Sequence, residues 1–251
     1  MIRRRFLTFS TIALLSTLIA ATGLSQQKYP EPHTQTLESN ERMTPAEAKR
    51  LLEEGNKRFI AGALISRPIR QQVRETAKGQ FPFANILSCQ DSRTSSQLLF
   101  DLNNGDVFTL KVAGNVANPD MLGGLEFGTG PHYAKLIAVV GHTDCGAIKG
   151  TIDSKAAIDA GARGNLLDLL RRIRPALDMV DPRITPRDSK NPEYVTAVAK
   201  ANVELVMKEI CANSKDLRDR IISKRWGLIG GLHNVATGEV LFFRESDCRD
   251  R

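Results

Sequence analysis

The chain has 251 residues, of which 41% are hydrophobic and 25% are charged, and its formal net charge at pH 7 is +7. This composition is typical of a globular protein and excludes a low-complexity or collagen-like chain. Basic residues are interspersed with acidic ones, and one Trp and three Tyr offer few surfaces for stacking on bases, so nucleic-acid binding is not expected.

The first 25 residues have the pattern of an export signal. Arg3, Arg4 and Arg5 precede an uncharged run that extends to Leu24, where small residues offer cleavage sites. Residues 3–7 also resemble the twin-arginine signal. We therefore expect residues 1–25 to be a signal peptide and the protein to be periplasmic or otherwise extracytoplasmic. The alternative is an uncleaved leader, which would be the only contact of the chain with a membrane.

Residues 26–43 are polar and contain two prolines, a composition that is typical of a flexible linker. A single catalytic domain is expected over residues 44–251. Its first helix is predicted to begin at Pro45, because Thr44 can cap it and Glu47 can complete a capping box. A second helix is predicted near residues 67–78, and the two form an N-terminal helical arm.

After this arm the pattern changes to short apolar segments rich in branched residues, which predict β-strands. These segments occupy residues 83–88, 107–112, 136–141 and 226–233. Apolar residues at helical spacing predict helices over residues 163–180 and 192–212. Because strands alternate with helices, we expect an α/β fold with a mainly parallel central sheet and flanking helices. A turn at residues 236–238 predicts a last, antiparallel edge strand over residues 240–243.

Two short motifs each follow a predicted strand. Cys89 is followed by Asp91 and Arg93, and His142 is followed three residues later by Cys145. Ligands in open α/β sheets bind beyond the carboxyl ends of the strands, so we expect the two motifs to form one site. Two thiolates and an imidazole are a ligand set for zinc, and three protein ligands leave a fourth position open, as in catalytic zinc sites.

Asp91 and Arg93 can form a charge-assisted ion pair beside this site. If Arg93 holds Asp91, the fourth zinc position stays free for water, whose pKa zinc lowers towards about 7. Asp91 can then accept a hydrogen bond from zinc-bound hydroxide and orient it towards an electrophile. A buried cysteine, a loop histidine and an ordinary salt bridge are the alternatives, and they leave the pairing of the two motifs unexplained.

These residues resemble the motifs Cys-x-Asp-x-Arg and His-x-x-Cys of the β-class carbonic anhydrases. The resemblance extends from about Thr44 to Phe243, and it includes Gly79-Gln80-Phe81-Pro82, Asp106-Val107-Phe108, Ala113-Gly114-Asn115 and, as the start of a helix, Leu125-Glu126-Phe127. It implies reversible hydration of CO₂ to bicarbonate and a proton by attack of zinc-bound hydroxide. It also implies one Zn²⁺ per subunit, held by Cys89, His142 and Cys145, with Asp91 and Arg93 as a gating pair.

The resemblance further implies a substrate pocket and a partner. Gln80 would contact the substrate across a dimer interface, and Phe108, Ala113 and Phe127 would line a small apolar pocket for CO₂. Because the pocket of the family is completed by a second subunit, a homodimer or a larger even oligomer is expected. Plain core packing is the alternative role of the two phenylalanines.

The chain departs from common patterns of the family at two places. Lys111 and Val112 stand where many members have Arg-Asn, and Phe59 stands where one subgroup has a tryptophan. In that subgroup the arginine and the tryptophan help to form a non-catalytic bicarbonate site. We therefore expect no strong inhibition by bicarbonate and a mainly open zinc site.

Two other functions fit the same residues. Hydrolysis of carbonyl sulfide or carbon disulfide would use the same zinc site with a different pocket. A zinc-stabilised binding protein without turnover would not need the Asp91–Arg93 pair. Of the remaining cysteines, Cys211 lies on a predicted helix and Cys248 in the charged C-terminal tail, where they can form a disulfide or stay free thiols.

Overall fold

The computed structural model of the chain describes residues 34–249, and the predicted signal peptide lies outside the described residues. No helix of this part is long and apolar enough to cross a membrane. The helices are α1 (Leu37–Arg42), α2 (Pro45–Ile60), α3 (Ile69–Thr76), α4 (Ser96–Leu99), the short 3-10 helix η1 (Ala113–Asn115), α5 (Pro119–Gly128), α6 (Gly146–Asp153), α7 (Lys155–Asp159), α8 (Asn165–Asp178), α9 (Pro192–Asn213) and α10 (Lys215–Ile222). The strands are β1 (Ala84–Ser88), β2 (Val107–Lys111), β3 (Leu136–His142), β4 (Gly227–His233) and β5 (Val240–Ser246).

The five strands form one sheet in the order β2-β1-β3-β4-β5. The first four strands are parallel, and β5 is antiparallel to β4 at the edge. All residues of β3 are buried, as expected for a central strand that has helices on both faces. The predicted α/β fold with a mainly parallel sheet and an antiparallel last strand is therefore confirmed.

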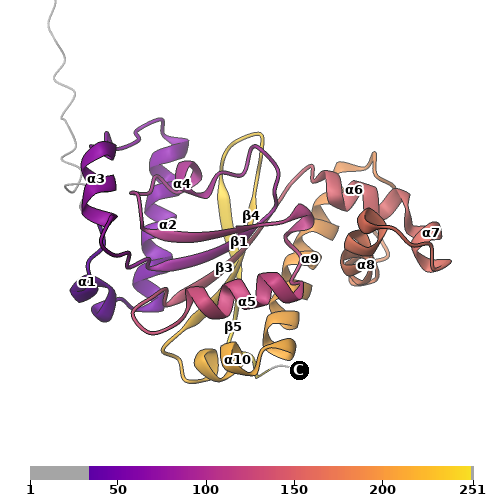
Figure 1. The fold of residues 1–251 in the computed structure, drawn as a ribbon. Coiled ribbons are helices and arrows are strands. Elements are labelled where there is room, and N and C mark those ends of the chain that lie inside the picture. The colour runs from indigo at the N-terminus through magenta and orange to yellow at the C-terminus, as the bar shows by residue number, and fades with distance from the viewer. Residues whose placement is uncertain (1–33, 250–251) are drawn as a thin grey trace, which may run out of the picture. The chain divides into compact units, whose positions relative to one another are not determined.

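Helices cover both faces of the sheet (Figure 1). Side chains alternate along each strand, so Ile86 packs with the cluster of α2 and α4, whereas Leu87 packs with the cluster of α5, α9 and α10. A third apolar cluster, built mainly from α6, α8 and α9, includes Cys89 and Cys145. This group of helices therefore packs against the residues that directly follow β1 and β3.

The helix predicted from Pro45 is confirmed as α2, with Thr44 as its N-cap. Helices α3, α8 and α9 also lie close to their predicted ranges. The structure departs from the predicted linker, because residues 37–42 form α1, which begins with a capping box. In α1 the buried Asn40 side chain donates a hydrogen bond to the Pro82 carbonyl (2.8 Å), which fastens this helix to the loop before β1.

The expectation that a helix starts at Leu125 is wrong. Helix α5 begins at Pro119 and ends at Gly128, so Leu125 lies in its last turns. Asn118 caps the true start by accepting a hydrogen bond from the Met121 N–H (2.8 Å). An asparagine followed by proline is a recognisable start signal, and here the helix begins six residues earlier than expected, which is nearly two turns.

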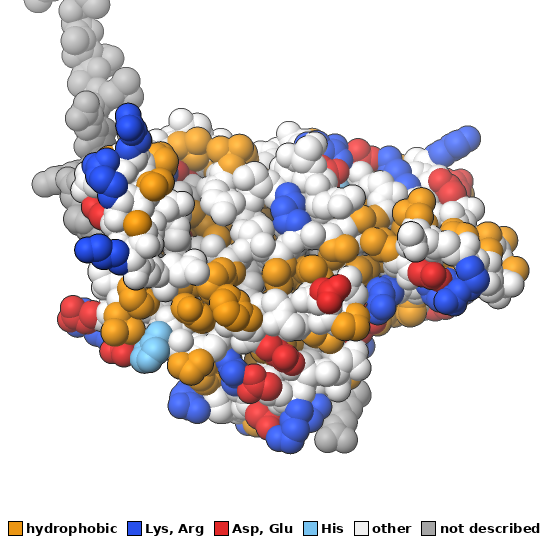
Figure 2. All heavy atoms as spheres, viewed as in Figure 1, with side chains coloured by type: hydrophobic (Ala, Val, Ile, Leu, Met, Phe, Trp, Pro, Cys, Tyr) orange, Lys and Arg blue, Asp and Glu red, His pale blue; other side chains and the backbone are white. Residues whose placement is uncertain are grey.

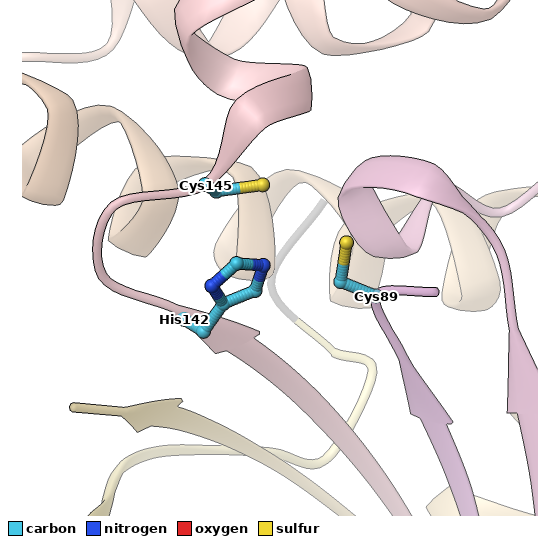
Figure 3. Close-up of side chains that lie close together, drawn as sticks. All are labelled: Cys89, His142 and Cys145. Carbon is cyan, nitrogen blue, oxygen red and sulfur yellow. The ribbon is translucent and has the colours of Figure 1, made fainter. Parts of the chain in front are cut away.

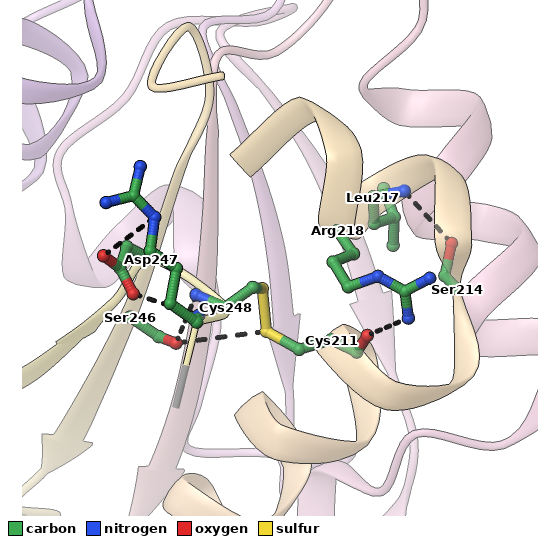
Figure 4. The surroundings of a disulfide bond; sticks show 8 residues. Cys211, Ser214, Leu217, Arg218, Ser246, Asp247 and Cys248 are labelled. Atoms are coloured by element: carbon green, nitrogen blue, oxygen red, sulfur yellow. Dashed lines mark hydrogen bonds and ion pairs between the residues drawn. A yellow bond between two sulfur atoms is a disulfide. The ribbon is translucent and has the colours of Figure 1, made fainter. Parts of the chain in front are cut away.

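The two cysteines outside the motifs form a disulfide. Cys211 lies near the end of α9 and Cys248 follows β5, and their Cα atoms are 5.4 Å apart (Figure 4). Both residues are buried, and the Arg218 guanidinium donates to the Cys211 carbonyl (3.1 Å). Of the two states that the sequence leaves open, the structure has the disulfide, which ties the segment after β5 to a helix that covers the sheet.

Candidate metal centre

The three candidate ligands meet at the carboxyl ends of the inner strands β1 and β3. The ligand atoms of Cys89, His142 and Cys145 all lie within 4.8 Å of one another, and the two sulfur atoms point towards the same space beside the imidazole (Figure 3). Ser88 and Val140 are partners in the register of β1 and β3, so Cys89, which follows β1, lies beside the last two residues of β3, and His142 is the last of them. The structure thus brings the two motifs into one cluster, as the sequence predicts.

The donor set fits a divalent metal ion. The exposed fractions of Cys89, His142 and Cys145 are 4%, 1% and 2%. Nε2 of His142 is buried and has no hydrogen-bond partner among the described residues. A buried polar nitrogen without a partner is costly, and a metal ion between the sulfurs and this nitrogen would satisfy it.

The two thiols of the cluster shift each other's pKa in opposite directions. The hydrogen bond with Cys145 lowers the pKa of Cys89, and the same bond, together with burial, raises the pKa of Cys145. The Gly114 N–H also donates to the Cys89 sulfur (3.4 Å) and favours its thiolate. Because thiolates are the form that binds metals, a dication bound by both sulfurs would require Cys145 to lose its proton as well.

Hydrogen bonds around Thr143 orient the imidazole of His142. Nδ1 of His142 donates to the Thr143 carbonyl (2.8 Å), which leaves Nε2 to face the sulfurs. The Thr143 N–H donates to the His233 carbonyl (2.9 Å), and its hydroxyl accepts from the Val235 N–H (3.1 Å). The end of β4 therefore holds the turn between the two ligands of the second motif. Thr143 is a positioning residue that was not predicted, and the signal for it in the sequence is its place inside the His-x-x-Cys motif.

Arg93 holds Asp91 in a bidentate ion pair. Its Nε and NH2 atoms lie 3.0 and 2.8 Å from the two carboxylate oxygens. These bonds hold the pKa of Asp91 well below its usual range, so the carboxylate stays ionised. Oδ2 of Asp91 lies 3.9 Å from Nε2 of His142, and Arg93 also reaches Asp144 (3.4 Å) in the second motif. The pair therefore faces the candidate ligands and links the two motifs.

Lys111, at the end of β2, holds the turn that carries this ion pair. Its ammonium donates to the carbonyls of Asp91 (3.2 Å) and Thr94 (2.9 Å) and to the Thr94 hydroxyl (3.1 Å). Thr94 is buried, and its hydroxyl also bonds to the Cys89 carbonyl (2.8 Å). An edge strand thus positions the first motif through one lysine, a role that only the folded structure reveals.

Of the residues expected to contact substrate, Ala113 lies near the cluster. It begins η1, and the next residue, Gly114, contacts the Cys89 sulfur through its N–H. Gly114 has a positive φ of 66°, and a Cβ atom there would lie 2.4 Å from the Ile173 side chain. Glycine is therefore required at the position that donates to the sulfur.

The other three residues lie at the opposite end of β1. Gln80 precedes this strand, and Phe108 pairs with Asn85 near its start, so Phe108 is on the order of 13 Å along the strand from Cys89. Phe127 is 63% exposed and packs against Phe108, with ring centroids 5.8 Å apart. Within one chain, these three residues are not brought to the candidate metal centre.

Comparisons with known proteins agree with the geometry of the site. The family model for carbonic anhydrase matches residues 84–240. The chain is 35% identical over 137 residues to the carbonic anhydrase of Mycolicibacterium smegmatis, across 53% of this chain and 65% of that protein. It is 31% identical over 204 residues to carbonic anhydrase 2 of Mycobacterium tuberculosis, across 78% of this chain and 92% of that protein. A tetrameric β-carbonic anhydrase from Sordaria macrospora shares the fold, with a TM-score of 0.57 and 22% identity across 70% of this chain and 92% of that chain.

Proposed function

Because the chain belongs to the β-class carbonic anhydrase family, we propose that it hydrates CO₂ reversibly to bicarbonate and a proton. The observation that carries this proposal is the buried cluster of Cys89, His142 and Cys145, with the carboxylate of Asp91 facing it. Two thiolates and one imidazole suit Zn²⁺, one per subunit. When bound there, Zn²⁺ would supply Lewis-acid chemistry that lowers the pKa of water to about 7.

The side chains around the cluster would orient the reactants and exclude bulk water. Asp91 can accept a hydrogen bond from the attacking water and so direct its lone pair towards the carbon of CO₂. Arg93 keeps this carboxylate ionised and fixes its orientation, since both carboxylate oxygens accept hydrogen bonds from the guanidinium. Burial of the three ligands keeps the surroundings dry, which strengthens the electrostatic interactions during the reaction.

We also propose that the active form is a homodimer or a larger even oligomer. Gln80, Phe108 and Phe127 lie at the strand end away from the metal centre of their own chain, so they can serve such a site only on a second subunit. Apolar side chains gather on the face over α5, where Phe127 is exposed (Figure 2). The relative from Sordaria macrospora is described as tetrameric.

We propose that the protein is exported. Residues 1–25 have the pattern of a signal peptide, and the disulfide between Cys211 and Cys248 is typical of proteins in oxidising compartments. Cells that express the full chain should therefore contain it in the periplasm, and changing Arg3 and Arg4 to Lys should keep it in the cytoplasm. Cytoplasmic retention of the unchanged chain would contradict export.

Stopped-flow CO₂ hydration by the zinc-loaded protein tests the proposed activity. We expect turnover that rises with pH through about 7. The variant Asp91→Asn should lower kcat at least about 100-fold, because it loses the oriented carboxylate. Its zinc content, measured by atomic absorption, should not change, since Asp91 is not a ligand in the proposed site.

A second Asp-x-Arg pair provides a matched control. Asp181 and Arg183, in the loop after α8, make the same bidentate contact, with distances of 3.0 and 2.6 Å. Asp181→Asn should leave kcat within about twofold, as is usual for surface substitutions. Stoichiometric zinc without turnover would overturn the proposed function.

A further inference from the structure

Three basic side chains surround the single tryptophan of the chain, Trp226. Nζ of Lys135 lies 5.1 Å from the centroid of its ring, and the guanidinium carbons of Arg220 and Arg225 lie 5.6 and 5.2 Å away. We call these four residues the Trp226 cluster. An indole ring attracts cations through its faces, but it carries no net charge that could neutralise three of them.

The Trp226 cluster is built on regular elements of the fold. Lys135 directly precedes β3 and Trp226 directly precedes β4, and the Gly227 N–H donates to the Lys135 carbonyl (2.9 Å). Arg220 lies on α10, where its NH2 atom is 2.7 Å from Asp216. The sheet fixes the backbone at Lys135 and Trp226, and the ion pair with Asp216 fixes the side chain of Arg220. This order lowers the entropic cost of binding a ligand.

Two cations of the cluster lack an acidic partner. Asp216 neutralises Arg220, but within residues 34–249 no carboxylate forms an ion pair with Lys135 or Arg225. Glu41 attracts Lys135 only by a longer-range electrostatic interaction, and its carboxylate lies 3.4 Å from Nδ1 of His132. Burial, followed by the charge of Arg225, lowers the pKa of Lys135. Both cations lie within 5.2 Å of the same ring centroid, and the charge of Arg225 disfavours the charged form of Lys135, so an anion bound beside both would relieve their repulsion.

We propose that the Trp226 cluster binds a free oxyanion of the phosphate class. The ammonium of Lys135 and the guanidinium fork of Arg225 would be the direct ligands, since these groups form strong charge-assisted hydrogen bonds with phosphate oxygens. Arg220 would not be a direct ligand, because its charge is neutralised and two of its nitrogens are engaged by Asp216.

This oxyanion site is separate from the metal centre. It lies at the amino ends of β3 and β4, whereas the metal centre lies at the carboxyl end of β3. The seven residues of β3 separate the two sites by roughly 20 Å, at about 3.3 Å per residue. The proposed anion therefore does not occupy the position of the substrate.

The fluorescence of Trp226 provides a direct test, because no other tryptophan contributes to the emission. Inorganic phosphate would be titrated into the purified full chain at constant ionic strength, with chloride as the balancing salt. We expect a saturable change of emission that chloride does not produce. A linear response, or the same response to chloride, would overturn the proposal.

Three variants assign the response to the cluster. Lys135→Gln and Arg225→Gln should each raise the Kd for phosphate about tenfold, because each removes one charged ligand. Lys200→Gln is the matched control, since Lys200 lies 4.8 Å from the ring of Phe243 instead of Trp226, and its Kd should equal that of the wild type. Equal affinity in all four proteins refutes the site.

Two further measurements keep this test decisive. Thermal melts establish that each variant is folded. Equilibrium dialysis with labelled phosphate gives the amount of bound phosphate without fluorescence. At a free phosphate concentration of about ten times the wild-type Kd, it should show about 0.9 bound phosphate per wild-type chain and about 0.5 per chain in Lys135→Gln and Arg225→Gln, as a tenfold higher Kd requires. Equal amounts of bound phosphate in the wild type and both variants would contradict the proposal even if the emission changes.

Discussion

At the scale of single residues, Lys111 shows how one side chain can organise a site from a distance. It stands where many members of the family have arginine, and in this chain its three hydrogen bonds hold the turn that carries Asp91. The absence of strong inhibition by bicarbonate, which we expect from this departure, stays a prediction. The direct consequence of the contacts is that Lys111 positions the first motif.

Replacing Lys111 therefore tests the link between β2 and the candidate site. Lys111→Met should lower the free energy of unfolding by about 1 kcal/mol, a typical value for lost hydrogen bonds. It should lower kcat about tenfold, because a less ordered Asp91 is positioned less well. Lys111→Arg keeps the charge and donors and should retain most of the activity. Urea unfolding and stopped-flow assays measure both effects, and an unchanged kcat in Lys111→Met would show that the turn is fixed without this lysine.

Asp106, directly before β2, makes the stability of the fold depend on pH. Its Oδ2 accepts a hydrogen bond from the Asn103 N–H (2.7 Å), whereas its buried Oδ1 has no partner within residues 34–249. Burial raises the pKa of Asp106 to about 6. Since the unfolded carboxyl titrates near 4, the folded state holds this proton more tightly. The contribution of Asp106 to stability is therefore greatest below about pH 4 and is lost as the pH rises to about 6.

The variant Asp106→Asn separates this titration from the hydrogen bond. An amide keeps the acceptor for the Asn103 N–H but cannot ionise, so the variant should be more stable than the wild type above pH 6, by up to about 3 kcal/mol. Below pH 4 the two proteins should be similar. Urea unfolding from pH 4 to pH 8 measures the difference, and a difference that does not change with pH would exclude Asp106 as its source.

At the scale of elements, the disulfide joins the end of α9 to the segment after β5. Its two cysteines are separated by 37 residues, which include α10, β4 and the edge strand β5. In the chain-entropy description, closing a loop of this length stabilises the fold by about 4 kcal/mol, because it restricts the unfolded chain. Because this effect acts on the unfolded chain, the bond stabilises the folded state as a whole, including the edge strand β5 inside the closed loop.

The variant Cys248→Ser should show this stabilisation directly. Its free energy of unfolding should fall by about 2–4 kcal/mol relative to the oxidised wild type. A reducing agent should lower the Tm of the wild type to that of the variant and leave the Tm of the variant unchanged. Equal values of Tm for the wild type with and without reductant would contradict this account.

At the scale of the whole molecule, the proposed oligomer places an aromatic cluster at a subunit interface. The rings of Phe108, Phe127 and Tyr133 pack together with centroids 5.4 to 5.8 Å apart, beside the edge strand β2. Phe127 is still 63% exposed in the single chain. A second subunit that covered this cluster would bury apolar surface that one chain leaves in water.

A charge at this position should weaken the assembly. Phe127→Glu should raise the dissociation constant of the dimer at least about tenfold, as is typical of central aromatic residues in interfaces. Leu241→Glu is the matched control, because Leu241 is also 63% exposed but lies on β5, at the opposite edge of the sheet. Sedimentation velocity measures both variants. A dimer that tolerates Phe127→Glu but dissociates with Leu241→Glu would place the interface at the other edge.

The fold class and the candidate ligands could be predicted from the amino-acid sequence alone. The spacing of apolar residues depends on which faces of a strand or helix are buried. Short stretches of sequence were therefore enough to predict the parallel strands and the helices α2, α8 and α9. Cys89, His142 and Cys145 could be predicted as ligands because their two motifs each follow a predicted strand and because their residue types suit zinc.

The contacts between segments that are far apart in the sequence follow from the folded chain. The register of β1 and β3 brings the two motifs together, and the packing of α9 against the segment after β5 brings Cys211 and Cys248 within bonding distance. Lys111 acts through main-chain atoms of a distant segment, so no local pattern predicts its role in positioning the first motif. The spacing of residues along the sequence reports on local structure, such as one face of a helix or strand. The distance between residues far apart in the sequence depends instead on how the helices pack against the sheet.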